Sequence, residues 1–235
     1  MPLHEHLREL RNRLIVYLVF LVPVGVYAFV QARRIIGILL LPSHGAVSSL
    51  VVLSPTEGIY AFLDVALVSA FVVTSPVLIY EVAAFVRPAL DPAERRLILV
   101  YAPLVLLLFL GGVLFGYFAF LPVVLRFVLG FEQAPFHAFL SLNNYIGFII
   151  NLTLPFGLIF ELPVVVYGLA RAGLLTPTFL RKQRRVAILV IFVVAAAVTP
   201  PDALSMLIMV APMLALYEAS ILVADLAVRR RPPVL

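Results

Sequence analysis

The sequence predicts an all-α integral membrane protein that crosses the bilayer six times. Of its 235 residues, 64% are hydrophobic and 12% are charged, which is about half the charged share of an ordinary soluble domain. Uncharged runs of 19 to 29 residues recur along the chain, and helices of that length cross a hydrocarbon core of about 30 Å. The runs do not alternate with the period of two that a membrane β-barrel requires.

The distribution of Lys and Arg predicts the topology. Six spans with both termini in the cytoplasm place 14 of the 17 basic residues on the cytoplasmic side, as the positive-inside rule requires. Residues 35–56 also lack charge, but Pro42 and the polar residues after it interrupt them. We therefore expect an interfacial helix and a packed loop on the far side there, not a seventh span. The expected spans are residues 14–32, 58–80, 97–120, 145–169, 186–198 and 203–224.

The connections between these spans carry most of the polar side chains. Residues 1–13 repeat leucine at helical spacing, which predicts an amphipathic helix lying along the interface. We expect residues 121–143 to form a second far-side loop, 171–185 a basic cytoplasmic loop and 199–202 a tight turn. No internal repeat or low-complexity linker divides the chain, so the sequence predicts one membrane domain over residues 1–235.

The fifth and sixth spans are short. The thirteen residues 186–198 rise about 20 Å as a helix, less than the hydrocarbon core. A mismatch of this size is relieved by thinning of the bilayer or by packing against a helix of another protein. Either this edge is a docking site for a partner helix, or the side chains of Arg184, Arg185 and Glu218 relieve the mismatch by snorkelling to the interface.

Residues 85–96, between the second and third spans, are strongly charged and contain two prolines four residues apart. The prolines prevent one continuous helix, so the chain turns back at the membrane surface and presents Glu94 beside three arginines. An acid there could receive a cationic partner. Glu9, near the N-terminus, has two interpretations: a functional acid, or a surface pair with Arg13 worth only about 0.3–0.5 kcal/mol.

Glu161 is the clearest anomaly within the apolar runs, because 28 uncharged residues precede it and nine more follow it. An acidic residue at the centre of a span costs on the order of 2.5–3.5 kcal/mol. Glu161 either faces a functional polar site inside the bundle, or is protonated and donates to a helix carbonyl freed by Pro155 or Pro163.

Several classes of function lack the residues they need. The chain has no Cys, which excludes disulfides, thiolate nucleophiles and Cys-based metal sites. It has no hydrolase, zinc-protease or phosphate-binding motif, and its four His fall in loops or at the interface. We expect no enzymatic activity, no metal and no cofactor. The basic residues lie at the ends of apolar runs, which indicates membrane topology and not nucleic-acid binding.

Four motifs in chain order resemble the TatC family, a subunit of the twin-arginine translocase. HLRELRNRL at residues 6–14 resembles the family's N-terminal segment, and FVRPAL at 85–90 with ERR at 94–96 resembles its first cytoplasmic loop. FELPV at 160–164 is similar to its fourth-span motif, and TPPD at 199–202 to its last periplasmic turn. Together the motifs cover essentially the whole chain.

The resemblance implies a concave, glove-shaped bundle in an energy-transducing membrane, such as the bacterial cytoplasmic membrane. It implies a receptor that recognises signal peptides with paired arginines and moves folded proteins across that membrane with the proton-motive force. The acids matching Glu9 and Glu94 receive the two arginines of the signal. The residues around them are Phe85, Leu10, Arg11 and Arg13.

The resemblance also implies roles for other regions. Pro42 matches a proline of the far-side cap, and Glu161 matches the acid inside the concave face. The fifth and sixth spans match the docking region for the single-span partners TatA and TatB, within a homo- or hetero-oligomer. Many members carry Gln where Met206 stands, so a polar contact to a partner is missing here. The implied docking residues are Thr199, Pro200, Asp202, Ser205 and Met206.

Two other classes of membrane protein compete with this interpretation. A secondary transporter would use Glu161 as its proton or ion site, but it favours an inverted repeat, and residues 1–120 and 121–235 show no internal symmetry. A structural scaffold without a ligand would leave Glu9, Glu94 and Glu161 without a joint purpose.

Overall fold

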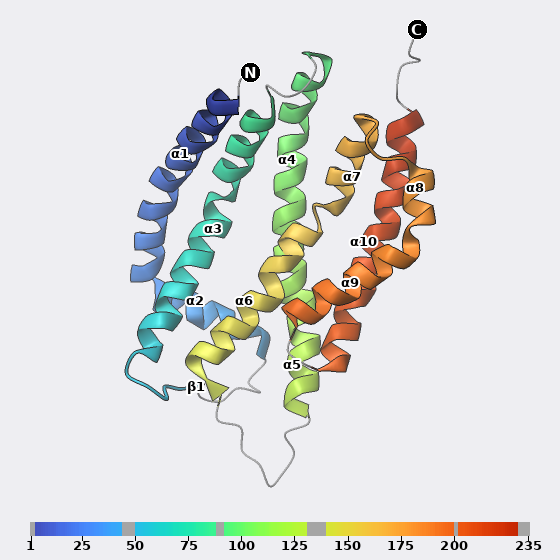
Figure 1. Cartoon of the computed structure of the whole chain (residues 1–235). Helices are drawn as coiled ribbons and strands as arrows, with labels where there is room; N and C mark the ends of the chain where they lie inside the picture. The colour runs from blue at the N-terminus through green and yellow to red at the C-terminus, as the bar shows by residue number, and fades with distance from the viewer. Residues whose placement is uncertain (1–2, 44–49, 88–91, 131–139, 200–201, 230–235) are drawn as a thin grey trace. The chain divides into compact units, whose positions relative to one another are not determined.

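Almost all of the described chain is helical (Figure 1). The computed structural model describes residues 3–43, 50–87, 92–130, 140–199 and 202–229. The chain forms two compact units, unit 1 made of Met1–Leu110 and Glu132–Ile150, and unit 2 made of Gly111–Phe131 and Asn151–Leu235.

Unit 1 holds three complete helices, a short turn and two short strands, together with parts of two further helices. These elements are α1 (Leu3–Val30), α2 (Ala32–Leu39), the 3-10 turn η1 (Leu41–Ser43), β1 (Leu50–Val51), α3 (Glu57–Val86), β2 (Leu140–Ser141) and the first parts of α4 (Pro92–Phe115) and α6 (Leu142–Ile159). Unit 2 holds the rest of α4 and α6 and all remaining helices. These are the π-helical turn η3 (Gly116–Phe120), α5 (Leu121–Gly130), α7 (Leu162–Arg171), α8 (Pro177–Lys182), α9 (Arg184–Val198) and α10 (Ala203–Arg229).

The predicted class, an all-α membrane protein, is confirmed. Within the described residues, five stretches are long and apolar enough to cross a membrane: His4–Val30, Glu57–Val86, Tyr101–Val128, Leu142–Arg171 and Ala203–Arg229. The short fifth span of the prediction is α9, which has 15 residues. That the six helices belong to a single membrane domain stays a prediction.

In unit 1, α1 and α3 lie side by side and run in opposite directions (Figure 1). Small residues line their contact, and Gly25 approaches the Cβ of Ala70 closely enough that an added Cβ would lie 3.7 Å from it. Ala61 and Ala70 are completely buried. The hydroxyls of Tyr17 and Thr74 lie 3.2 Å apart across the same contact. This seam therefore joins the helices through close packing of small side chains and one buried hydrogen bond.

The buried carboxylate of Glu57 joins the two far-side segments of unit 1. It accepts hydrogen bonds from the backbone N–H groups of Leu53 at 2.5 Å, Ser54 at 3.3 Å and Asn143 at 3.0 Å, and from the hydroxyl of Ser141. The same segments pair as the parallel strands β1 and β2. A carboxylate only accepts hydrogen bonds, so four donors match its needs and fix the start of α3.

Unit 2 is built on the packing of α7, α8 and α10. Its core cluster consists of Val166, Ala170, Leu180, Ile221, Ala224 and Ala227. The hydroxyl of Tyr217 donates to the backbone oxygen of Leu180 at 2.8 Å. Two ion pairs join α10 to α9 and α8. Arg184 of α9 pairs with Glu218 at 2.8 Å, and Arg181 of α8 pairs with Asp225.

The structure differs from the prediction in two of the expected connecting segments. The amphipathic segment 1–13 is not a separate interfacial helix, because α1 runs without a break from Leu3 to Val30. The far-side loop expected from residue 121 is wrong as far as Gly130, since the helix continues through the π-helical turn η3 into α5.

The fourth span, expected as one helix over residues 145–169, is broken in two. α6 ends at Ile159 and α7 begins at Leu162. Pro163 explains the break, because it cannot donate to the carbonyl of Ile159 four residues earlier. Phe160 and Glu161 therefore form a short turn that connects α6 to α7.

Candidate functional site

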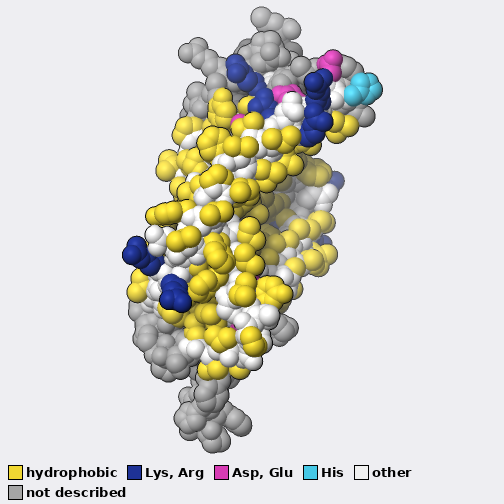
Figure 2. Space-filling model, turned by 90° about the vertical axis from the view of Figure 1, so that its left-hand side faces the viewer, with side chains coloured by type: hydrophobic (Ala, Val, Ile, Leu, Met, Phe, Trp, Pro, Cys, Tyr) yellow, Lys and Arg dark blue, Asp and Glu magenta, His cyan; other side chains and the backbone are white. Residues whose placement is uncertain are grey.

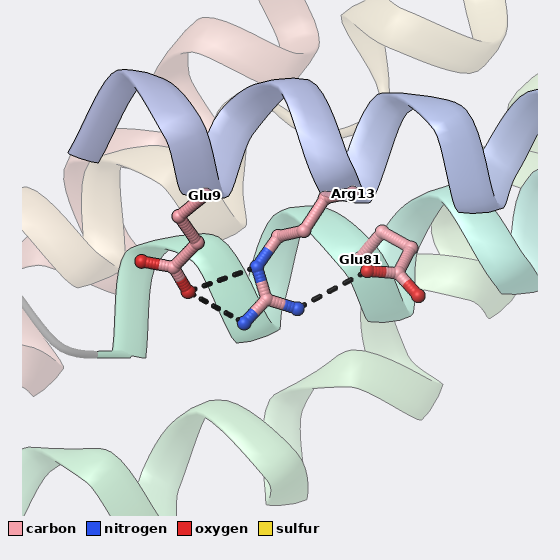
Figure 3. A network of polar contacts seen from close by, with 3 residues as sticks. All are labelled: Glu9, Arg13 and Glu81. Carbon is pink, nitrogen blue, oxygen red and sulfur yellow. Dashed lines mark hydrogen bonds and ion pairs between the residues drawn. The ribbon is translucent and has the colours of Figure 1, made fainter. Parts of the chain in front are cut away.

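Two carboxylates and one guanidinium join α1 to α3 near the N-terminal end of α1 (Figure 3). The Nη2 and Nε atoms of Arg13 donate to one oxygen of Glu9 at 2.6 and 3.0 Å. Its Nη1 atom donates to an oxygen of Glu81 at 3.1 Å. One guanidinium therefore bridges acids from two helices, one of which lies 68 residues away in the chain.

The local sequence explains why these three side chains meet. Glu9 and Arg13 stand four residues apart on one helix and share a face. Glu81 enters from α3, which extends to Val86 instead of ending at residue 80 as expected. The side chains of Glu9, Arg13 and Glu81 are 23%, 26% and 13% exposed. Water screens such partly buried charges less than fully exposed ones.

An aromatic contact holds the same end of the two helices one turn further on. The rings of His6 and Phe85 stack with centroids 4.3 Å apart and planes 22° from parallel. Phe85 stands four residues after Glu81, and His6 three residues before Glu9, so both contacts use the same faces of α1 and α3. Two independent contacts, the bridge through Arg13 and the stacking of His6 on Phe85, therefore fix the position of Glu81 relative to Glu9.

A groove of about 570 Å³ opens over the ion cluster. It is lined by Glu5, Arg8, Glu9, Asn12, Arg13, Val16, Tyr80 and Glu81. The face shown in Figure 2 is mostly hydrophobic; acidic, His and several basic side chains gather toward its upper end, and two basic side chains stand apart lower on the left. This pattern is that of a bilayer-embedded surface with a polar site at its edge. Carboxylates beside such a groove can hold the planar, bidentate fork of a guanidinium.

The structure brings only part of the predicted site together. Arg11 is exposed and donates to the Asn12 side chain at 3.4 Å, and Leu10 is 46% exposed. Glu94 falls in the first turn of α4, but its side chain lies outside the described residues. The joint role of Glu9 and Glu94 stays a prediction.

Sequence reasoning missed Glu81. It directly follows the expected end of the second span at residue 80 and stands one helical turn before Phe85. That spacing was the available signal, because positions i and i+4 share a helix face.

Glu161 and Pro42 lie in irregular backbone. Glu161 is half-buried at the turn between α6 and α7. Its backbone oxygen accepts from the N–H groups of Val164 and Val165, both at 3.0 Å. Pro42 is buried in the 3-10 turn η1. Their predicted roles stay predictions.

The predicted docking residues around α10 mostly make local contacts. Thr199 is buried and its hydroxyl donates to the backbone oxygen of Ala195 at 2.8 Å. Asp202 accepts from the N–H of Ser205 at 2.6 Å, so it caps the N-terminus of α10. Ser205 is completely buried and Met206 half-buried, while Pro200 lies outside the described residues. Docking at this turn stays a prediction.

The fold and the cluster together define a multi-pass helical membrane protein that holds a guanidinium between carboxylates at one end of its helices. Within the described part of the chain, no group of three or more His, Cys, Asp or Glu side chains could hold a metal ion.

Comparisons with known proteins identify the family. The family model described as Sec-independent protein translocase protein (TatC) matches residues 5–212. A TatC protein of Carboxydothermus hydrogenoformans is 39% identical over 95% of this chain and 93% of its own length. A TatC protein of Aquifex aeolicus is 41% identical over 98% of both chains.

A solved structure agrees with these relatives. The crystal structure of a twin-arginine translocase receptor, TatC, superimposes with a TM-score of 0.85 and 38% identity over 94% of this chain and 99% of its own. The chain belongs to the TatC family. Its relatives are named as translocase components, which points to a role in Sec-independent protein transport and not to an enzyme.

Proposed function

We propose that this chain is the receptor subunit of a twin-arginine translocation system and binds signal peptides that carry two adjacent arginines. One observation carries the proposal: the guanidinium of Arg13 already sits between the carboxylates of Glu9 and Glu81. The site therefore offers the partners that an arginine of a signal peptide needs. Glu94 is the second acid of the proposed site, and Phe85 is its proposed aromatic residue.

Magnitudes limit what the arginine contacts can do. An exposed Arg–carboxylate pair contributes roughly 0.2–1 kcal/mol, whereas a millimolar complex needs about 4.1 kcal/mol. Two such pairs cannot supply that free energy, even with bidentate geometry. We infer that the acids select the ligand, while burial of its apolar stretch against the helices or lipid supplies most of the affinity.

The short helix α9 is the proposed docking edge for the single-span partners TatA and TatB. Its 15 residues rise about 22 Å, less than the hydrocarbon thickness. Its side chains Leu189, Val190 and Val193 are 65%, 53% and 62% exposed. A partner helix at this edge would cover apolar surface and relieve the mismatch. With these partners the complex exports folded proteins across the bacterial cytoplasmic membrane, using the proton-motive force.

Glu161 is the proposed polar site within the membrane. It lies at the break between α6 and α7. In membrane proteins, such a break within a span can expose polar groups to a cavity. The same interruption is the feature that a secondary transporter would use to bind a proton or ion. Uptake of ions or small solutes into vesicles, compared with binding of a precursor, separates these two functions.

The proposed function is tested by peptide binding to the chain in lipid nanodiscs. A fluorescent signal-type peptide with two arginines should bind several-fold more tightly than the same peptide with two lysines, because an ammonium lacks the bidentate fork. Glu9→Gln should weaken the arginine peptide. Asp225→Asn, which removes the ion pair to Arg181, is the matched control and should leave binding unchanged. Equal binding of both peptides, together with no effect of Glu9→Gln, would refute the proposal.

A further inference from the structure

Arg13 occupies the position that an arginine of a ligand would need. Its guanidinium makes two hydrogen bonds to Glu9 and one to Glu81 beside the groove. The chain therefore already binds, within itself, the chemical group that the proposed ligand presents. An incoming guanidinium that uses Glu9 must compete with Arg13 for the same carboxylate.

The cluster can accept a second guanidinium, because it has excess negative charge and unused acceptor oxygens. Two carboxylates and one guanidinium leave it with a formal charge of −1. Among the described residues, Glu9 uses only Oε1 and Glu81 only Oε2 as acceptors. The remaining oxygen of each carboxylate points away from Arg13 (Figure 3).

We propose that Arg13 is an exchangeable internal occupant of the arginine site, and that Glu81 is the positioning residue that retains it when an arginine of the ligand takes Glu9. This inference rests on the proposed function. In the free receptor, Arg13 bridges both acids. In the complex, the ligand pairs with Glu9 while Arg13 stays paired with Glu81.

Glu81 makes the exchange favourable because it keeps the displaced cation paired. Without Glu81, release of Glu9 would leave Arg13 unpaired next to the incoming guanidinium, and like charges at close range repel. With Glu81, two ion pairs exist after the exchange and each carboxylate faces one cation. Arg13 needs only a change of side-chain rotamer, since the third bond to Glu81 is already formed.

A direct contact between Glu81 and the ligand would also make Glu81 important, and a double-mutant cycle separates the two cases. The cycle compares the unmodified chain with Glu81→Gln, Arg13→Gln and the double variant. If Glu81 acts by retaining Arg13, its removal matters only while Arg13 is present. If Glu81 binds the ligand itself, its removal matters equally in both backgrounds.

The experiment measures the dissociation constant of the two-arginine peptide for these four chains in nanodiscs. We expect Glu81→Gln to weaken binding about five-fold, the effect of one partly exposed ion pair. Arg13→Gln should bind at least as tightly as the unmodified chain, because the internal competitor is gone. In the Arg13→Gln background, Glu81→Gln should change binding less than two-fold. An equal loss in both backgrounds would overturn the exchange.

Two further variants keep the inference testable. Glu81→Asp retains the charge on a shorter side chain and should weaken binding less than Glu81→Gln, and it replaces the Gln variant in the cycle if that chain does not fold. Glu9→Gln separates the two proposals. If Glu9→Gln weakens binding but the effect of Glu81 is independent of Arg13, only the exchange is wrong. If Glu9→Gln has no effect, the proposed site is wrong and the exchange with it.

Discussion

Replacement of Gly112 by Ala tests a close backbone contact between two helices in unit 2. A Cβ added to Gly112 would overlap the carbonyl oxygen of Phe156, and it would lie 2.8 Å from that carbonyl carbon and 2.9 Å from the Cα of Gly157. All three atoms belong to the backbone of α6, so no change of side-chain rotamer relieves the overlap. The two helices must move apart, and the contact between the Phe115 and Phe156 rings, at 5.4 Å, is disturbed with them.

The magnitude follows from overpacking and helix propensity. Forcing extra atoms into a packed contact costs about 1–3 kcal/mol, and a rigid backbone obstacle favours the upper end of that range. Ala gains about 0.5–1 kcal/mol over Gly within a helix. The net loss for Gly112→Ala is therefore about 2 kcal/mol, or about 4–8 °C in unfolding temperature on the scale of a domain this long.

Gly111 provides a matched control in the same helix. A Cβ added there meets no atom within 4 Å, so Gly111→Ala should gain helix propensity without overlap and unfold at the same or a higher temperature. Gly116→Ala is an intermediate case, because its Cβ would lie 3.0 to 3.1 Å from Thr153 and Phe156.

Thermal unfolding can be followed with a thiol-reactive dye, because the chain has no Cys of its own. Ser205→Cys places one thiol at a completely buried position whose hydroxyl has no hydrogen-bond partner among the described residues. The dye then reports exposure of α10 in each glycine variant. If Gly111→Ala and Gly112→Ala unfolded at the same temperature, the close approach of α4 to α6 would not contribute to stability and the packing argument would be wrong.

Three further predictions concern single side chains. Glu57→Gln should destabilise the chain by about 1–3 kcal/mol in the same dye assay, because its amide would face backbone N–H groups that need an acceptor; an unchanged unfolding temperature would contradict this. Asp202→Ala should cost about 1 kcal/mol through loss of the cap on α10, and Asp202→Asn should restore most of it; a variant that loses partner binding without losing stability would indicate docking instead. Glu161→Gln should reduce export in a transport assay more than it lowers the unfolding temperature, and equal losses would show that Glu161 serves only folding.

The charge pattern was sufficient to predict a multi-pass helical membrane protein, because burying ions in lipid is costly for every such segment. Ending each span at its first charged residue placed the end of a helix too early where a charged side chain still belongs to that helix. Glu81 ended the expected second span, although α3 continues to Val86. The break beside Glu161 had a local signal in Pro163, but charge counting over a long apolar run does not detect it.

Only the part of the candidate site that lies on one helix could be predicted from the sequence. The pair of Glu9 with Arg13 follows from their spacing on one helix. The contact with Glu81 depends on how α1 packs against α3, which no local pattern encodes. The pairing of β1 with β2 involves two residues from each strand, too few for a period-two pattern to be recognised.

The proposed exchange of partners would leave α1 and α3 joined, because contacts outside the ion cluster hold these helices together. The seam between these helices is closed by Gly25 against Ala70, by the hydrogen bond of Tyr17 and by the ring of Phe85. Partly exposed ion pairs add little to stability, typically about 0–1 kcal/mol, so releasing Glu9 from Arg13 does not separate the helices. A cluster that were itself the main link between α1 and α3 could not give up a carboxylate to a ligand without opening the fold. The proposed reversible binding of guanidinium groups at this end of unit 1 therefore depends on a division between an apolar seam for stability and a polar cluster for recognition.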